Sequence, residues 1–194
     1  MKTLIKLLFF VLLLVCFVAC NGNSKTSKNT TNEKADNERA SQKEGQAFMK
    51  DEGGTPNALQ LAISSEDHTT LVAAVQAAEV ENALVNVGPL TVFAPNNAAF
   101  AKIDEATLNS LLEPENKSKL AFILTHHVAP ANYPVEMLKK NAVKGRKLYM
   151  ASGKYLEVME KDGDIYVDGV KIIGTVNVSN GWVHVTEEVI LPKD

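Results

Sequence analysis

The chain is poor in cysteine: of its 194 residues only Cys16 and Cys20 carry thiols, and both lie at the amino terminus. Residues 21–194 can therefore hold no disulfide, no thiolate metal site and no cysteine nucleophile. A folded unit of about 130 residues does not need a disulfide, because it buries roughly two-thirds of the surface that its unfolded chain exposes. Stability must come from ordinary side-chain packing.

An excess of basic charge and a phosphate-binding loop are also lacking. The 20 Lys and Arg residues are outnumbered by 23 Asp and Glu residues, and the net charge is −3. Nucleic-acid binding depends on clustered Lys and Arg, so no nucleic-acid partner is expected. Neither GxGxxG nor GxxxxGK[ST] occurs in the chain, which argues against the two common nucleotide loops.

The amino terminus has the features of a targeting segment. Lys2 and Lys6 form a basic region before the apolar run Leu7–Val18, which is too short to span a bilayer comfortably. The run ends in Phe17-Val18-Ala19-Cys20, which resembles the cleavage box of bacterial lipoproteins. Residues 1–19 are therefore predicted to be a lipoprotein signal peptide, with Cys20 as the acylated first residue of the mature chain. The alternative is a secretory signal cut after Ala19, which fits less well because Phe17 stands where a small residue is preferred.

Residues 20–56 are predicted to be the acylated cysteine followed by a disordered tether. The segment is rich in Asn, Ser, Thr, Lys, Glu and Gly, and its only large apolar side chains are Phe48 and Met49. It cannot bury enough apolar area to offset the entropy that ordering would cost. A flexible coil of this length spans about 35 Å, which would hold a following domain clear of lipid headgroups.

Residues 57–194 are predicted to form one folded domain. Apolar residues recur at helical spacing in the first half, and the pattern changes to period two in the second half. Asp162-Gly163-Asp164 and Asn180-Gly181 are predicted to be tight turns between strands. Helices are expected near residues 59–63, 69–78, 83–87, 98–100, 106–112, 114–126 and 133–140, and strands near 91–93, 147–151, 155–161, 165–167, 171–173, 176–178 and 182–186. Helices followed by strands indicate an α+β domain.

The segment Leu90–Phe100, LTVFAPNNAAF, joins a strand to a helix within a few residues. Thr91-Val92-Phe93 is a strand signal of β-branched and aromatic residues. Pro95 stops the strand because it has no N–H and biases the residue before it away from helix. Asn96 or Asn97 can then cap a helix whose first turn ends at Phe100. For the helix expected near residues 69–78, the expected cap is Asp67 or Thr69.

A second segment near the carboxyl end, NVSNGWVHVTEEVILP at 177–192, accompanies the first. Together the two resemble the signature boxes of the fasciclin-like (FAS1) domain family, whose members are extracellular adhesion and matrix modules. Where the family has a Tyr-His pair between the boxes, this chain has His126-His127. The resemblance implies a FAS1-like β-wedge or sandwich with a helical amino-terminal half. The positions that match the family signature are Thr91, Val92, Phe93, Ala94, Pro95, Asn96, Phe100, His127, Asn180, Gly181 and His184.

Candidate catalytic and metal-binding residues are few. Adjacent helical residues point about 100° apart, so His126 and His127 are badly placed to chelate one metal ion. His127 and His184 are interpreted as structural residues that each bond a backbone carbonyl or a nearby side chain, the alternatives being a ligand or a general base. The remaining candidates lack charge partners or a nucleophile-elbow context; they are Glu187-Glu188, Asp162 with Asp164, Ser64-Ser65 and Ser179. No catalytic residue, metal site or cofactor is predicted.

Trp182 is the single tryptophan of the chain and has two interpretations. The favoured one is that it caps the core beside the Asn180-Gly181 turn. The other is that it is an exposed anchor for a partner.

These features predict a membrane-anchored binding module on the surface of a bacterium, acting in adhesion or in contacts with a matrix or a protein. Its partners would be a membrane, through the lipid on Cys20, and another protein or a glycan. An outer membrane is favoured because Asn21, not Asp, follows Cys20. The alternative is a carrier of a small apolar ligand, a lipid or a pigment, held between the helices and the sheet as the family resemblance allows. An enzyme is the least favoured class.

Overall fold

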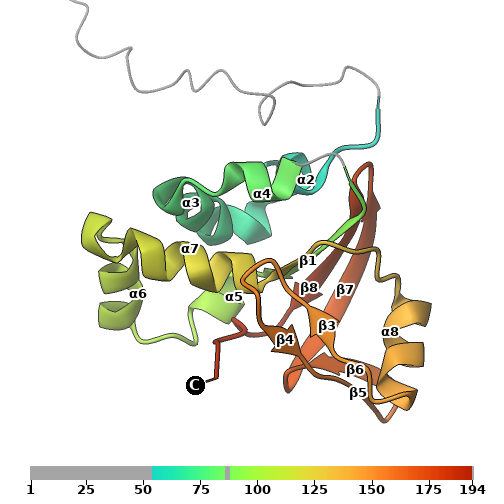
Figure 1. The fold of residues 1–194 in the computed structure, drawn as a ribbon. Helices are drawn as coiled ribbons and strands as arrows, with labels where there is room; N and C mark the ends of the chain where they lie inside the picture. The colour runs from blue at the N-terminus through green and yellow to red at the C-terminus, as the bar shows by residue number, and fades with distance from the viewer. Residues whose placement is uncertain (1–53, 86–87, 194) are drawn as a thin grey trace, which may run out of the picture. The chain divides into compact units, whose positions relative to one another are not determined.

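The computed structural model describes residues 54–85 and 88–193, so the predicted signal peptide, Cys20 and most of the predicted tether lie outside the described residues. Within them the amino-terminal part is mostly helical and the carboxyl-terminal part is rich in strands, which confirms the α+β prediction (Figure 1). The helices are α2 (Ala58–Ser64), η2 (Glu66–His68), α3 (Thr69–Ala78), α4 (Glu81–Val85), α5 (Asn97–Phe100), α6 (Glu105–Leu112), η3 (Pro114–Asn116), α7 (Lys117–His126) and α8 (Val135–Val143). The strands are β1 (Leu90–Pro95), β2 (Val128–Ala129), β3 (Leu148–Tyr149), β4 (Tyr155–Leu156), β5 (Val158–Lys161), β6 (Asp164–Val167), β7 (Val170–Val178) and β8 (Gly181–Thr186).

Six of the described strands form one sheet in the order β2-β1-β8-β7-β6-β5, and β3 and β4 form a separate hairpin. Strands β1 and β8 are parallel, whereas the other neighbours in the sheet are antiparallel. The parallel pair joins segments from opposite ends of the folded region. The sheet therefore depends on long-range pairing at its centre.

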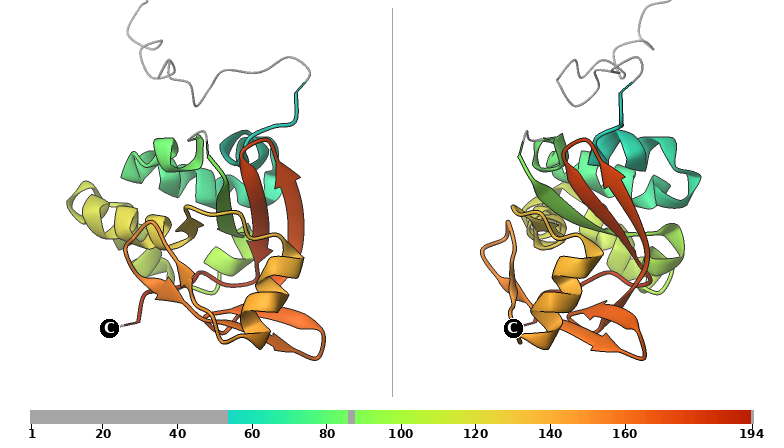
Figure 2. Two further views of the ribbon diagram at one scale, coloured as in Figure 1. Left: turned by 45° about the vertical axis from the view of Figure 1, so that its right-hand side comes forward. Right: turned by 90° about the vertical axis from the view of Figure 1, so that its right-hand side faces the viewer.

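Strand β7 bends the sheet. Its first residues pair with β6, its later residues pair with β8, and the register shifts between Ile172 and Gly174. Such a shift locally increases twist and turns the strand. The β5–β6 end of the sheet accordingly swings away from the β1–β8 part, as the two views of Figure 2 show.

Two apolar cores lie on opposite faces of β1. On one face helices α2, α3, α4, α6 and α7 pack against alternate residues of the strand, among them Val92 and Ala94. On the other face Phe93 belongs to a second core built from α8, the β3–β4 hairpin and the β5–β6 end of the sheet. Because both faces are covered, all six residues of β1 are buried.

Several expected details differ in the structure. The two strands expected near 171–173 and 176–178 are one strand, β7, because the chain passes the register shift without a turn. Strand β2 has two residues and no sequence signal. Helix α2 has only seven residues and buries Ala58 and Leu59, whereas Ile63 near its end is 45% exposed. None of the described helices is both long and apolar enough to cross a membrane.

Candidate functional site

The two signature segments lie side by side as the parallel strands β1 and β8. Leu90 pairs with Gly181, Phe93 with His184 and Pro95 with Thr186. About ninety positions of sequence separate these partners, so only the tertiary fold brings them together. The signature is thus one continuous structural unit in the middle of the sheet.

Gly181 permits the closest backbone approach in this unit. Its φ is +143°, and a Cβ placed there would lie 1.8 Å from the carbonyl oxygen of Leu90. The neighbouring Asn180 uses its whole side chain: Oδ1 accepts a hydrogen bond from the N–H of Ala58 at 3.0 Å, and Nδ2 donates to the carbonyl of Leu84 at 2.8 Å. The turn before β8 therefore holds α2 and α4 against the end of the sheet.

Asn96 and Asn97, which follow β1, cap two different helices. Asn96 caps α5, because its Oδ1 accepts from the N–H of Ala99 at 2.8 Å. Asn97 caps α3 instead, since its Oδ1 accepts from the N–H of Thr70 at 3.0 Å and its Nδ2 donates to the carbonyl of Glu66 at 2.9 Å. The prediction that Asp67 or Thr69 caps α3 is wrong: the helix has no local side-chain cap and takes one from another element.

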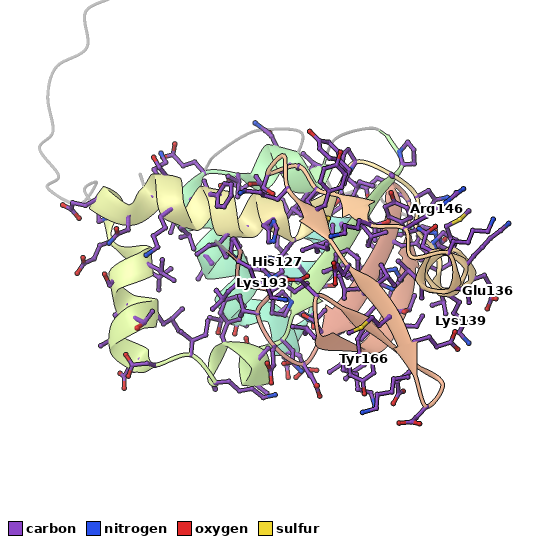
Figure 3. The ribbon with its side chains drawn as sticks, turned by 60° about the horizontal axis from the view of Figure 1, so that its bottom comes forward. His127, Glu136, Lys139, Arg146, Tyr166 and Lys193 are labelled. Atoms are coloured by element: carbon purple, nitrogen blue, oxygen red, sulfur yellow. The ribbon has the colours of Figure 1, made fainter. Side chains whose placement is uncertain are left out.

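His127 joins α7 to the carboxyl-terminal segment. Its Nδ1 donates to the carbonyl of Ile123 at 2.8 Å, and its Nε2 accepts from the backbone N–H of Ile190 at 2.9 Å. Burial lowers the pKa of His127 from 6.5 to about 4, and the Ile123 carbonyl opposes this shift. The ring is neutral at pH 7, with both nitrogens occupied. Figure 3 shows it in the interior of the domain.

His184 has a similar role in the second core. Its Nε2 donates to the carbonyl of Tyr133 at 2.8 Å, its Nδ1 accepts from the hydroxyl of Thr175 at 2.9 Å, and the ring stacks on Phe93. Burial lowers its pKa, with the Tyr133 carbonyl opposing. Thr91 completes the network, because its Oγ1 accepts from the N–H of Tyr133. His127 and His184 thus both make the backbone contacts expected from the sequence.

His126 points to different partners from those of His127. Its Nδ1 lies 2.9 Å from the hydroxyl of Ser152, and its ring stacks against Phe122. Burial lowers the pKa of His126, and the Asp168 carboxylate opposes this. Among the residues that the structure describes, no three His, Cys, Asp or Glu side chains are grouped so that they could hold a metal ion.

A partly open cavity of about 120 Å³ lies between α2–η2 and the sheet. Its walls are mostly aliphatic and include Leu61, Leu71, Val92, Val176, Val183 and Val185. Two polar residues, Ser65 and His68, also line it, and the Ser65 hydroxyl lies 2.8 Å from Nδ1 of His68. The Nε2 of His68 is buried and has no hydrogen-bond partner among the described residues. Sequence reasoning named Ser65 only among the nucleophile candidates and did not name His68, because both residues fall in the short connection between α2 and α3.

Trp182 is half-buried and belongs to neither core of the described domain. It lines an open, largely polar hollow of about 600 Å³, together with Asn132, Asn177 and Ser179. Trp182 thus lies beside the Asn180-Gly181 turn, as expected, with part of its side chain accessible.

The structure also exposes a basic segment that sequence reasoning missed. Residues 139–143 form the second half of α8 and residues 144–147 connect the helix to β3, and most residues of this segment are exposed. Figure 3 shows Lys139 and Arg146 on this side of the molecule, away from His127. The signal was present as the sequence KKNAVKGRK, but the negative net charge of the whole chain concealed it.

Comparisons with known proteins agree with this geometry. Residues 66–192 match the family model described as Fasciclin domain. The chain is 42% identical over 135 residues to Protein sll1483 of Synechocystis, covering 69% of this chain and 72% of that protein. It is 34% identical over 140 residues to transforming growth factor-beta-induced protein ig-h3 of Sus scrofa, covering 70% of this chain but only 20% of that protein. The fold resembles a FAS1 domain pair from the insect cell adhesion molecule fasciclin I, with a TM-score of 0.64 at 18% identity, over 71% of this chain and 51% of that one.

Proposed function

The chain belongs to the fasciclin domain family, and from that premise we propose that it is a non-catalytic binding module acting in adhesion at a bacterial cell surface. The observation that carries the proposal is the match of residues 66–192 to a domain that also builds the insect cell adhesion molecule fasciclin I. The buried signature residues support it. Their polar groups form hydrogen bonds inside the domain and so stabilise the fold. The outer surfaces of the domain remain available for contacts with a partner.

The proposed attachment to the membrane rests on the sequence of residues 1–56. Acylation of Cys20 with two or three chains would anchor the protein firmly, because each buried CH₂ contributes about 0.8 kcal/mol and a single chain binds only marginally. The polar segment after Cys20 would then act as a tether. Many tethered copies on one cell give avidity, so each domain can bind its partner weakly.

The first test is the position of the domain on intact cells. Protease treatment followed by mass spectrometry should release peptides from residues 57–193 without lysis, while a cytoplasmic control protein stays intact. Replacing Cys20→Ser should move the protein from the membrane fraction to the soluble fraction, whereas Ser41→Ala in the tether should not. Retention of the Cys20→Ser protein in membranes would contradict the proposed anchor.

The second test concerns adhesion itself. Cells that lack the protein should adhere less to matrix deposited by the same bacterium, and the wild-type gene should restore adhesion. The Cys20→Ser gene should not restore it at an equal protein level. Adhesion that does not depend on the protein, or peptides that appear only after lysis, would overturn the proposed function.

A second candidate function, binding of a small apolar ligand, is favoured by the cavity between α2–η2 and the sheet. Its volume of about 120 Å³ suits a body of roughly one ring, since engineered cavities of about 150 Å³ bind benzene. The unpartnered Nε2 of His68 can pair with a hydroxyl, which both donates and accepts. Burial lowers the pKa of His68 below its ordinary value of 6.5, and the Asp67 carboxylate partly opposes this shift. The ring is therefore neutral at pH 7 and suits an uncharged ligand.

Small neutral probes test this second function directly. Phenol should raise the melting temperature of the full-length chain more than benzene does, and His68→Phe should abolish that preference. Ala62→Trp at the cavity wall should block both probes, whereas Ala73→Trp on the exposed side of α3 should block neither. Equal responses of the wild type and Ala62→Trp would show that the cavity takes no ligand.

A further inference from the structure

The charge of this domain is unevenly distributed. The nine residues 139–147 contain five of the chain's 20 basic residues and no acidic residue, although the chain as a whole has a net charge of −3. The five are Lys139, Lys140, Lys144, Arg146 and Lys147. Such a concentration creates a local positive potential that the net charge does not reveal.

Two of these five cations are already paired with carboxylates. Lys147 lies 2.8 Å from Glu157, and Lys139 lies 3.9 Å from Glu160. The other three, Lys140, Lys144 and Arg146, are exposed and have no ion pair within the described residues. They are the charges available to an external anion.

The backbone fixes the spacing of these three cations. Lys140 lies in the last turn of α8 and Lys144 is the C-cap four residues later. The N–H of Lys144 donates to the carbonyl of Lys140 at 3.3 Å, so the two residues lie on the same side of the helix end. Gly145, at φ +60°, then turns the chain, and the N–H of Arg146 donates to the carbonyl of Asn141 at 2.9 Å. Backbone hydrogen bonds therefore order the turn before a ligand binds, so that binding has to immobilise the side chains alone.

An exposed aromatic pair follows directly along the chain. On β3, Leu148 is buried and Tyr149 points outward, 48% exposed. Its ring centroid lies 5.3 Å from that of Tyr155 on β4, which is 61% exposed. The salt bridge between Lys147 and Glu157 shows that the residues flanking the two tyrosines also lie on this outer face. Tyrosine combines an apolar ring face with a polar hydroxyl, and both suit the faces and hydroxyls of sugar rings.

We propose that Lys140, Lys144, Arg146 and the Tyr149–Tyr155 pair form a basic–aromatic surface that binds an acidic polysaccharide, a chain of sugars bearing carboxylates. The proposal rests on the function proposed above and names the chemistry of its partner. Sugar rings pack on the tyrosines, while carboxylates pair with the cations. Arg146 supplies a bidentate partner and the two lysines supply point charges.

The same features fit other polyanions less well. Duplex DNA carries a charge about every 1.7 Å, so the acidic remainder of the chain repels it strongly, whereas a uronate polymer carries one charge per sugar. Recognition of anionic lipid typically uses clusters of about four to eight basic residues, and only three are unpaired here. A carboxylated glycan needs fewer cations because the aromatic pair contributes contacts that do not depend on charge.

The test measures binding of polygalacturonate to the full-length chain, purified in a mild nonionic detergent. Lys140→Gln with Lys144→Gln should weaken binding at least tenfold, and the dependence of affinity on salt should become shallower. The matched control on α7, Lys117→Gln with Lys119→Gln, should change binding less than twofold. Tyr155→Ala should weaken binding of polygalacturonate while leaving binding of inorganic polyphosphate unchanged, because only the sugar polymer uses the ring.

Several results would overturn the proposal. Equal losses in the α8 and α7 variants would show a general charge effect without a defined surface. Binding of phosphatidylglycerol vesicles or duplex DNA in preference to polygalacturonate would assign the surface to a membrane or a nucleic acid. If the α8 variant loses nothing and adhesion of cells still depends on the protein, the binding function stands and another surface carries it. If adhesion never depended on the protein, the proposed function itself fails.

Discussion

At the scale of single residues, the family signature includes buried or partly buried polar side chains whose hydrogen-bonding groups are paired inside the fold. His127 and His184 each use both ring nitrogens in hydrogen bonds, and Asn180 uses both ends of its amide. A buried polar group without a partner costs about 1–3 kcal/mol, so each of these residues specifies its surroundings strictly. Substituting one of them therefore alters the stability of the domain.

His127 makes the stability of the domain depend on pH. Its pKa is about 4 in the folded protein and 6.5 unperturbed, so the unfolded chain binds the proton more readily. The stabilisation is fully present above pH 6.5 and is lost as the pH falls toward 4, by about 3 kcal/mol. Urea unfolding followed by Trp182 fluorescence should show this loss in the wild type. In His127→Gln, which is less stable at pH 7, the same pH change should cost distinctly less; parallel curves would refute the assignment.

Gly181 should tolerate no side chain. Gly181→Ala combines a strained φ of +143° with a collision against the backbone of Leu90, and should destabilise the domain by about 3 kcal/mol or more. The matched variant Gly153→Ala has a φ of +80° and open space around it, and should cost about 1 kcal/mol. Urea midpoints compare the two variants, and equal losses would mean that the close approach to Leu90 is unimportant.

At the scale of elements, two helices of this domain receive hydrogen bonds from asparagines that lie elsewhere in the sequence. The first turn of α3 receives its cap from Asn97, which lies after β1, and α2 is held by Asn180 at the start of β8. Short helices are marginal alone, because nucleation is costly and tertiary contacts supply most of their stability. These asparagines therefore couple the helical layer to the sheet.

Asn96 and Asn97 should have separable effects. Asn97→Ala should speed hydrogen exchange at the Thr70 amide and leave the Ala99 amide unchanged, whereas Asn96→Ala should do the reverse. Each substitution should cost about 1 kcal/mol in urea unfolding. Exchange that changes at both amides in both variants would show that the two caps form one unit.

At the scale of the whole domain, one strand serves two cores. Val92 packs with the helices on one face of β1, and Phe93 packs with α8 and the hairpin on the other. His127 adds a second link, because it joins α7 of the first core to Ile190 of the second. Neither core can open without disturbing the strand that both share.

We therefore expect a single unfolding transition for the folded domain. Far-UV circular dichroism and Trp182 fluorescence should give coincident urea curves. Leu120→Ala in the first core and Leu138→Ala in the second should each shift the one shared transition, by about 3 kcal/mol. Two separate transitions in either variant would show that the cores are independent.

Local sequence determined the kinds of element and many of their limits. The β5–β6 turn forms at Asp162-Gly163, where both residues have positive φ, and the junction of β1 with α5 lies where Pro95 and Asn96 indicate it. These features follow from backbone preferences and caps that act over a few residues. The two signature segments also sufficed to indicate the FAS1 fold, which the family model and the solved domain pair confirm.

Only the tertiary structure decided which distant residues meet. No local rule pairs β1 with β8 in parallel, gives the cap of α3 to Asn97, or leaves His68 facing a cavity. The same holds for the basic segment 139–147, where folding pairs two cations with Glu157 and Glu160 and leaves three exposed. The physical reason is that backbone propensity acts between neighbours in sequence, whereas burial, ion pairing and cavity shape depend on neighbours in space.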